Sequence, residues 1–329
     1  MRRRGRGVAG RQFRFVPIDE LQGGPHVVVD GAPRAGTAAT LSHWPGTPTD
    51  PRLWADVSAE IVLRARHEID LFVPAGVDAA TIDHYDVDAA ISLGLLVCEG
   101  LADTHGQLLA RAAHVGDFDV VTDRDSLLVA FALDALSEAT RDTAATEALS
   151  LLPDLVADPE GAEQLWGPQV AAYDAGVRLR EDGGLAIEED PALDLAVVRV
   201  AEDHPDLARS AWAGSPAHPA VVHSATRCLR VATVLGRHFD VRYRYESWVR
   251  LGSARPRPRV DLSMLAARLG GLEEDGGQWH FDGAAAITPV LVRADGRAST
   301  LAPERFLGLL RDELRTLDAG PPAWDPYRA

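Results

Sequence analysis

The sequence predicts an α/β protein with a mostly parallel sheet in its N-terminal part and a smaller, mixed α+β C-terminal part. Short apolar runs alternate with helical segments up to about residue 140, and strands dominate after residue 184. Between them lies a more polar, helical stretch that contains Pro153, Pro159 and Pro168. We therefore expect a disordered basic start over 1–12, an α/β metal-binding domain over 13–140, a helical connector with few core contacts over 141–184, and an α+β substrate-binding domain over 185–329.

The N-terminal elements are predicted from hydrophobic periodicity and turn residues. Residues 26–31 form an apolar run that ends in Asp-Gly, as a buried parallel strand ends at a functional edge. Residues 53–66 place four apolar side chains on one helix face, and the apolar segment 89–101 follows two aspartates that could cap a helix. The other elements expected in this half are strands at 40–43, 80–84 and 117–121 and a helix at 126–136.

The C-terminal part is predicted to be richer in strands. Residues 239–245 alternate apolar and charged side chains, which is typical of an antiparallel strand with one exposed face. Residues 261–272 form an expected helix with Asp261 at its N-cap, and 303–317 form a second helix with leucines at helical spacing. The remaining strands are expected at 195–200, 228–234 and 238–251.

Composition excludes several classes of function. Acidic residues outnumber basic ones 49 to 33, so the formal charge is −16 and nucleic acid is not expected as the main partner. Every basic residue is an arginine, which rules out lysine Schiff bases and P-loops. Cys98 and Cys228 form no CxxC pair, and no apolar stretch is long enough for a membrane span. We expect a cytoplasmic protein without a membrane partner, which could form a homodimer.

The most informative motif is the string IDHYDVDA at residues 82–89. His84, Asp86 and Asp88 are two residues apart, so in an extended segment their side chains project to the same side. One imidazole and two carboxylates at the end of a strand suit a divalent cation, Mn²⁺ or alternatively Mg²⁺ or Zn²⁺. The alternative is structural: an aspartate caps the following helix while His84 packs against the sheet.

Three further polar residues lie at predicted strand edges. Asp30 ends one strand, His43 precedes a tight turn, and Asp117 opens the segment 117–121. Edges of an open α/β sheet gather in one crevice, so we expect these side chains within reach of Asp86 and Asp88. Paired cations that activate water for phosphoryl transfer would need about this many ligands. The expected ligands of one or two ions per chain are Asp30, His43, His84, Asp86, Asp88 and Asp117, of which His84, Asp86 and Asp88 are also the expected catalytic residues.

The string His-x-Asp-x-Asp-Ala at residues 84–89 resembles the opening metal motif of the DHH phosphoesterase superfamily. The resemblance implies a Rossmann-like metal domain, a smaller substrate domain, manganese, and cleavage of a phosphodiester or phosphoanhydride in a small phosphate-containing substrate. Ser253, Arg255 and His280, the last after a glycine-rich stretch, are similar to the substrate-binding elements of that family and would bind substrate. The chain departs from the family in having no Asp-His-His triplet, and residues 272–275 split its glycines.

A second resemblance, to an uncharacterised group of actinobacterial proteins, lies in the strings YESWV at 245–249 and RVDL at 259–262. That group brings no activity with it. Two hypotheses of function therefore remain: a metal-dependent hydrolase of a small phosphate ester, and a non-catalytic binding protein on the same scaffold. Metal content after purification without a chelator would discriminate between them.

Overall fold

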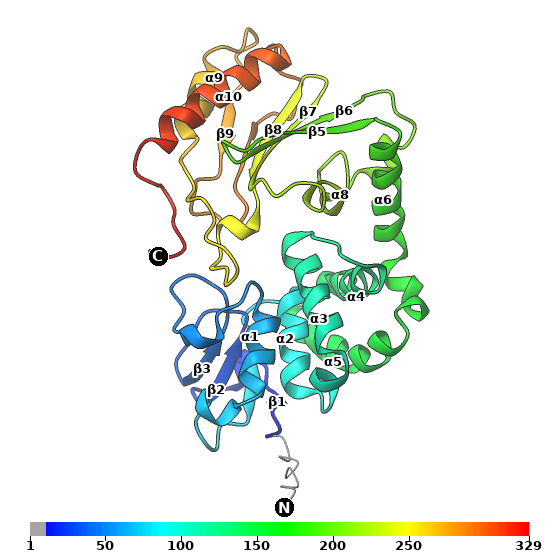
Figure 1. The fold of residues 1–329 in the computed structure, drawn as a ribbon, viewed down its shortest axis with the longest axis vertical. Helices are drawn as coiled ribbons and strands as arrows, with labels where there is room; N and C mark the ends of the chain where they lie inside the picture. Colours follow the sequence, from blue (N-terminus) through cyan, green and yellow to red (C-terminus); the bar gives the residue numbers. More distant parts are fainter. Residues whose placement is uncertain (1–10, 329) are drawn as a thin grey trace, which may run out of the picture.

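The first sheet of the protein consists of four parallel strands in the order β1-β4-β2-β3 (Figure 1). Val27, Val28 and Val29 of β2 are fully buried, as expected for a parallel strand covered on both faces. The computed structural model describes residues 11–328. The strands of this sheet are β1 (Arg14–Phe15), β2 (His26–Val29), β3 (Thr37–Leu41) and β4 (Ala79–Thr81).

Six helices belong to this half of the chain, of which α1 and α2 pack against the sheet. The apolar helix α2 is central, because its side chains from Val87 to Leu96 are all buried. It packs against α1, α3 and α5, and α6 runs from this part of the molecule up to the second sheet (Figure 1). The helices are α1 (Ser58–Arg66), α2 (Val87–Val97), α3 (Leu101–Phe118), α4 (Arg124–Asp134), α5 (Arg141–Ala157) and α6 (Glu163–Glu181), with short 3-10 turns at Ile18–Glu20, Pro51–Leu53, Ile69–Leu71, Ala135–Glu138 and Pro159–Ala162.

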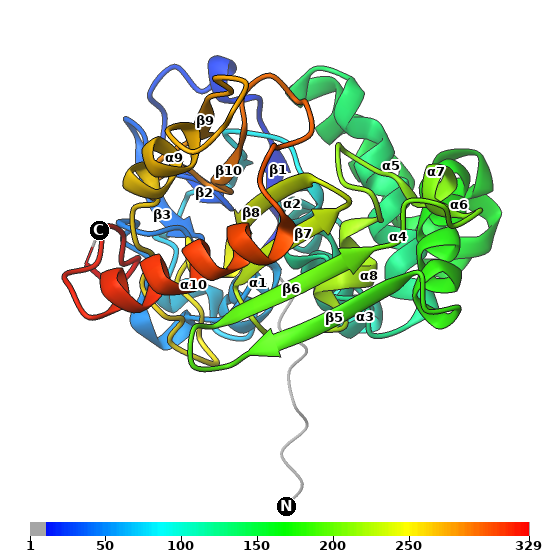
Figure 2. The same cartoon turned by 90° about the horizontal axis from the view of Figure 1, so that it is seen from above.

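The second sheet has six strands in the order β5-β6-β7-β8-β10-β9. Only β6 and β7 pair in parallel; the other pairs are antiparallel. Helices α9 and α10 cover its outer face (Figures 1 and 2). The elements are β5 (Leu185–Asp190), β6 (Leu195–Val200), α7 (Leu207–Ser210), α8 (Pro219–His223), β7 (Arg230–Leu235), β8 (His238–Tyr243), a 3-10 turn (Tyr245–Ser247), α9 (Ser263–Gly270), β9 (Trp279–Phe281), β10 (Val290–Arg293) and α10 (Pro303–Asp318).

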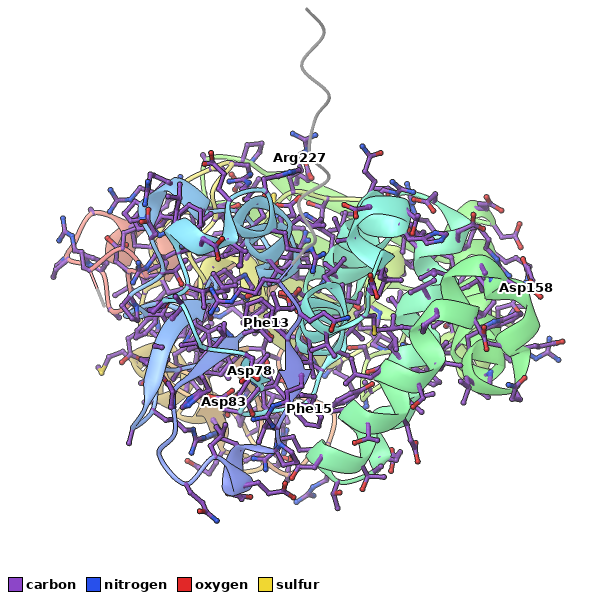
Figure 3. All side chains as sticks on the ribbon, turned by 90° about the horizontal axis from the view of Figure 1, so that it is seen from below. Phe13, Phe15, Asp78, Asp83, Asp158 and Arg227 are labelled. Atoms are coloured by element: carbon purple, nitrogen blue, oxygen red, sulfur yellow. The ribbon has the colours of Figure 1, made fainter. Side chains whose placement is uncertain are left out.

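The predicted mixed α/β architecture, with a parallel sheet first and a mixed sheet second, is therefore confirmed at this level. The alternation expected around 239–245 is present, since Phe239, Val241 and Tyr243 are buried in the second hydrophobic cluster. Phe13 and Phe15 at β1 belong to the first cluster or pack against it (Figure 3). Among the described residues, no helix combines the length and the apolar character that crossing a bilayer would require.

Several expectations differ from the structure. The segment 141–184 has many core contacts, because α5 and the first half of α6 contribute alanine, leucine and tryptophan side chains to the first cluster. Residues 117–121 do not form a strand: Phe118 ends α3 and Asp119 turns the chain in a left-handed conformation. Asp261 is not the N-cap of α9, although its carboxylate accepts a hydrogen bond from the Ser263 N–H. Most of the expected disordered start, 1–12, lies outside the described residues, but Arg11 donates to the Val73 carbonyl.

Two glycines test the packing of the first part. A Cβ at Gly116 of α3 would lie 2.3 Å from the Cβ of Val87 in α2, whereas a Cβ at Gly308 of α10 would meet nothing within 4 Å. We expect Gly116→Ala to lower the free energy of unfolding by about 1–3 kcal/mol through overpacking. Gly308→Ala should raise it by about 0.5–1 kcal/mol, because alanine is the better helix former. Urea unfolding measures both, and stabilisation by both substitutions would contradict the close contact of α2 and α3.

His218 precedes α8 and is 1% exposed. Its ring stacks on Trp212 and lies against Phe131 and Tyr173, while its Nδ1 accepts a hydrogen bond from the Ala220 N–H. Its Nε2 is buried without a partner among the described residues. Burial lowers the pKa of His218 to about 4.

This histidine should make the protein less stable as the pH falls from 6.5 to about 4. In that range the unfolded chain binds a proton at His218 and the folded protein does not, so the free energy of unfolding falls by about 3 kcal/mol. His218→Asn keeps an acceptor for the Ala220 N–H but does not titrate. Its unfolding, followed by circular dichroism between pH 8 and about 4, should lack this part of the pH dependence. An unchanged pH dependence would show that His218 titrates normally.

Candidate metal centre

The carboxyl ends of β2, β3 and β4 bring together the polar residues that follow these strands. Asp30 comes directly after β2, His43 follows β3, and His84 and Asp86 lie between β4 and the start of α2. Because the strands are parallel and adjacent, their carboxyl ends lie at one edge of the sheet. Asp117 reaches the same place from the last turn of α3, rather than from the strand that the sequence suggested.

The first group of potential ligands is formed by Asp30, His84 and Asp86, whose ligand atoms all lie within 4.8 Å of one another. Nε2 of His84 is 3.4 Å from Oδ2 of Asp30 and 2.9 Å from Oδ2 of Asp86. The side chains of His84 and Asp86 are 31% and 41% exposed, so this group is open to solvent on one side. Exchangeable ligands such as water could enter here.

The second group consists of Asp30, His43 and Asp88, again with ligand atoms within 4.8 Å of one another. Nε2 of His43 is 3.5 Å from Oδ1 of Asp30 and 3.4 Å from Oδ2 of Asp117. All four side chains are almost completely buried. The Oδ2 atom of Asp117 has no hydrogen-bond partner among the described residues.

Asp30 belongs to both groups and turns one carboxylate oxygen toward each. Its Oδ1 faces His43 and its Oδ2 faces His84. A carboxylate shared in this way could bridge a pair of cations. Nitrogen and oxygen donors without thiolates suit Mn²⁺, Zn²⁺ or Mg²⁺. The donor set therefore fits a divalent cation, and it offers positions for two.

Burial and mutual repulsion raise the pKa values of three carboxylates of the centre. Burial, followed by the charge of Asp30, raises the pKa of Asp88 to about 7. Burial and the charges of Asp88 and Asp86 raise the pKa of Asp117 well above its usual range, and burial with Asp86 raises that of Asp30. Burial opposes protonation of His84, but hydrogen bonds to Asp30, Asp83 and Asp86 outweigh it and raise its pKa. A bound cation would remove this repulsion.

Both histidines are oriented by an acceptor at Nδ1. Nδ1 of His43 lies 2.6 Å from the Asp56 carbonyl, and Nδ1 of His84 lies 2.8 Å from Oδ1 of Asp83. These acceptors require a proton on Nδ1, which leaves Nε2 of each ring directed at the carboxylates. Asp83, labelled in Figure 3, also accepts from the Ala32 N–H and lies so close to Gly31 that a Cβ there would be 2.4 Å from its Oδ1.

Asp86 and Asp88 also accept hydrogen bonds from N–H groups at the starts of helices. The capping alternative is therefore correct for Asp86, and it does not exclude a metal. Oδ1 of Asp86 accepts from the Ala89 N–H and caps α2, while its Oδ2 faces His84. Asp88 does not cap its own helix: its oxygens accept from the N–H groups of Ser58 and Ala59 at the start of α1. Each carboxylate thus serves a helix terminus and still has lone pairs toward the centre.

The C-terminal half contributes aromatic side chains to the centre. The Tyr245 hydroxyl lies 3.3 Å from Nε2 of His43, and it is buried beside the carboxylates. The Trp44 ring lies against the His84 ring, with 5.0 Å between the ring centroids, and packs edge-on against Trp248. The string 245–249 is therefore part of the wall of the centre.

The structure does not gather the three expected substrate-binding residues. Ser253 binds the Asp56 carboxylate with its N–H and its hydroxyl, Arg255 pairs with Asp325, and His280 pairs with Asp282. None of the hydrogen bonds or ion pairs among the described residues joins these three to one another or to the potential ligands. Ser253 is connected to the centre indirectly, because it binds Asp56, whose backbone carbonyl orients His43.

Besides Tyr245, sequence reasoning missed Ser58 and Asp83, which also contact the centre. Ser58 donates its hydroxyl hydrogen to Oδ1 of Asp30 at 2.7 Å, and nothing in its sequence context marks it. Asp83 was part of the string 82–89 but was not singled out, although its position next to a potential histidine ligand is a usable signal.

Comparison with known protein families gives one match. The profile of DUF6687, described as a family of unknown function, matches residues 11–308. None of the curated proteins compared with the chain matches it. The match therefore supplies no activity, and the geometry of the centre has to carry the functional argument.

Manganese should stabilise the wild-type protein, by about 2.7 kcal/mol at a concentration 100 times the dissociation constant. Asp86→Asn keeps an acceptor for capping α2 but removes one ligand charge, so it should be as stable as the wild type without metal and gain little from manganese. Asp123→Asn, at the N-cap of α4 outside the centre, should keep the full gain. Thermal unfolding with chelator or manganese measures all three. If manganese does not stabilise the wild-type protein, Asp86 serves only as the N-cap of α2 and not as a metal ligand.

Proposed function

Since the chain belongs to this family of unknown function, we propose from the centre itself that it is a metal-dependent hydrolase of a small phosphodiester or phosphoanhydride. The observation that supports the proposal is the placement of Asp30 between two nitrogen-and-oxygen donor groups, one open to solvent and one closed. Paired divalent cations bridged by a carboxylate recur in enzymes that hydrolyse phosphate esters. The proposal rests on this geometry and on the resemblance of residues 84–89 to a phosphoesterase motif.

The proposed ligands fall into two sets. Asp30, His84 and Asp86 would hold the solvent-exposed cation, and Asp30, His43 and Asp88 the buried one, with Asp117 beside the latter. When bound, such cations supply Lewis-acid chemistry and neutralise phosphate charge. Manganese is the first choice, with magnesium and zinc as the other metals that this donor set suits.

The neighbouring side chains would orient the proposed ligands and shield the buried group from solvent. Asp83 holds the His84 ring, and the Asp56 carbonyl holds the His43 ring, so that neither needs to reorganise when a ligand enters. The Ser58 hydroxyl fixes Oδ1 of Asp30. Tyr245 shields the buried group and presents a neutral hydroxyl next to it, since burial and the nearby carboxylates keep the pKa of its phenol well above the usual range.

A direct test is hydrolysis of bis-nitrophenyl phosphate by metal-free protein to which manganese is returned. Asp30→Asn should abolish the activity, because Asp30 is the ligand shared by both groups. Asp83→Asn should lower it by about 10- to 100-fold, the usual effect of losing a partner that orients a ligand. Asp123→Asn is the matched control and should retain the wild-type rate. The metal content of each variant, measured by elemental analysis, separates lost binding from lost positioning.

The opposing results are equally specific. Protein that binds manganese at the wild-type level but hydrolyses no phosphate ester would favour the non-catalytic binding protein. Hydrolysis that survives both chelation and Asp30→Asn would contradict a metal-dependent reaction.

A further inference from the structure

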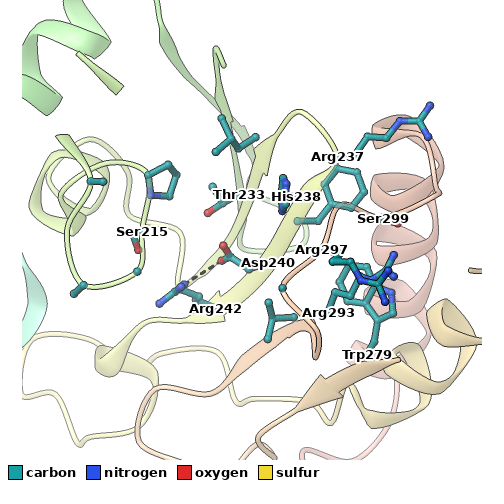
Figure 4. Close-up of a pocket in the computed structure, with 18 of the residues that line it drawn as sticks. Ser215, Thr233, Arg237, His238, Asp240, Arg242, Trp279, Arg293, Arg297 and Ser299 are labelled. Atoms are coloured by element: carbon teal, nitrogen blue, oxygen red, sulfur yellow. Dashed lines mark hydrogen bonds and ion pairs between the residues drawn. The ribbon is translucent and has the colours of Figure 1, made fainter. Parts of the chain in front are cut away.

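The face of the six-stranded sheet opposite helices α9 and α10 is only partly covered, because β5, β6 and the start of β7 pack there against α6 and α8 in a third hydrophobic cluster. Helices α9 and α10 pack on the face that carries the second hydrophobic cluster. Alternate residues of the strands point to the other face and line two hollows there, the larger of which is shown in Figure 4. Among them are Thr233, Asp240 and Arg242 in the larger hollow, and Val198, Val231 and Val290 in the smaller one.

The two hollows adjoin each other. The larger has a volume of about 590 Å³ and lies between strands β7, β8 and β10 and the loop 211–216. The smaller, of about 230 Å³, extends to Asp117 of the metal centre. Ser215, Pro216, Thr233 and Arg242 line both hollows. The larger volume alone falls within the range of about 300–1,000 Å³ that is usual for small-molecule sites.

The lining of the larger hollow is rich in arginine, in a chain with a formal charge of −16. Its lining includes four arginines but a single carboxylate, that of Asp240. Two of the arginines, Arg293 and Arg297, are compensated by acidic residues behind them. Arg237 forms no ion pair with any residue in the range 11–328. Arg237 is therefore the one arginine of this lining whose charge no acidic residue among the described residues pairs.

Arg242 is the arginine best placed to meet a ligand. It points into the hollow beside Asp240 (Figure 4), and its Nε donates to Oδ1 of Asp240 at 3.1 Å. Its two terminal nitrogens have no hydrogen-bond partner among the described residues. Such a guanidinium, held by a carboxylate on one side and free on the other, is suited to bind an anionic group.

Apolar side chains surround this charge. Val292 on β10 is 36% exposed, although it is a large hydrophobic residue in a strand. Trp212 and Leu235 lie on other sides of the larger hollow, and valines from β6, β7 and β10 form the wall of the smaller one. Apolar walls with one oriented charge are the usual features of a site for an organic molecule.

We infer that these adjoining hollows bind a small organic anion, with an apolar ring against the exposed Val292 and its negative group at Arg242. The inference does not depend on a metal, because the charge and the apolar wall belong to the second sheet alone. A further step does rest on the proposed function: the smaller hollow extends to Asp117, so the anion would be the part of the phosphodiester that stays outside the metal centre.

Two dyes test the binding of an anion. Anilinonaphthalene sulfonate has apolar rings and one sulfonate, and the neutral phenylnaphthylamine has the same rings without the charge. The wild-type chain should bind the sulfonate more tightly, as measured by fluorescence titration with chelator present. Arg242→Gln should weaken sulfonate binding by about tenfold and leave the neutral dye unaffected. Arg315→Gln, which removes an arginine paired with Asp312 on α10, is the control and should change neither.

A second pair of variants keeps the test valid if Arg242→Gln does not fold. Val292→Asn and Val292→Asp are nearly isosteric, and position 292 is exposed enough to accept either. The aspartate should weaken sulfonate binding about tenfold relative to the asparagine, through repulsion, while the neutral dye binds both equally. Equal affinity for the two dyes in the wild type, or sulfonate binding that ignores both charge changes, would overturn the inference.

The dye titration and the metal tests can each fail independently of the other. Asp86→Asn, which alters only the centre, should bind the sulfonate as the wild type does. If it does, and manganese still has no effect on the wild type, the proposed hydrolase is wrong while the anion site stands. Manganese-dependent hydrolysis without charge-selective dye binding would give the reverse result.

Discussion

The concentration of buried carboxylates around Asp30 is the constraint on which the rest of the structure depends. Asp30, Asp88 and Asp117 are almost fully buried, and two histidines are the only basic groups that the described residues place among them. Burying a carboxylate without a counter-charge is costly, and the raised pKa values of these aspartates express that cost. The strained backbone agrees: Asp30 has a φ of 44°, in the left-handed region. A bound cation would compensate this cost.

The same carboxylates also organise the helices, so fold and site cannot be separated. Asp86 caps α2, and Asp88 accepts from the first N–H groups of α1, which favour negative charge. Both helices therefore begin at the centre. Replacement of either residue by alanine would remove a cap and a potential ligand together. Asparagine separates the two roles, because its amide oxygen can still accept the capping hydrogen bond while the charge is gone.

The sequence predicted the centre better than it predicted the elements around it. Asp30, His43 and His84 could be found because buried apolar runs that end in polar residues indicate the carboxyl edge of a parallel sheet. Asp117 was identified from an expected strand, yet it lies at the end of α3, since FDVV after an apolar helix resembles a strand in local pattern. Ser58 and Tyr245 could not be found, because only tertiary packing brings them to Asp30 and His43. Ser253, Arg255 and His280 were assigned by resemblance, and in the structure each binds an aspartate outside the centre instead.

The two halves of the chain meet at this centre, and that places the smaller hollow of the second sheet beside it. Tyr245 reaches His43, Ser253 binds Asp56, and Arg244 donates to carbonyl groups of both Thr226 and Phe118. These contacts hold the second sheet over the end of α3, where Asp117 lines the smaller hollow. The negative centre belongs to the first half, and the terminal nitrogens of Arg242, which have no partner among the described residues, belong to the second. Only with cations at the centre would a ligand that spans the two need an apolar body with anionic groups at separate positions, a requirement that neither half imposes alone.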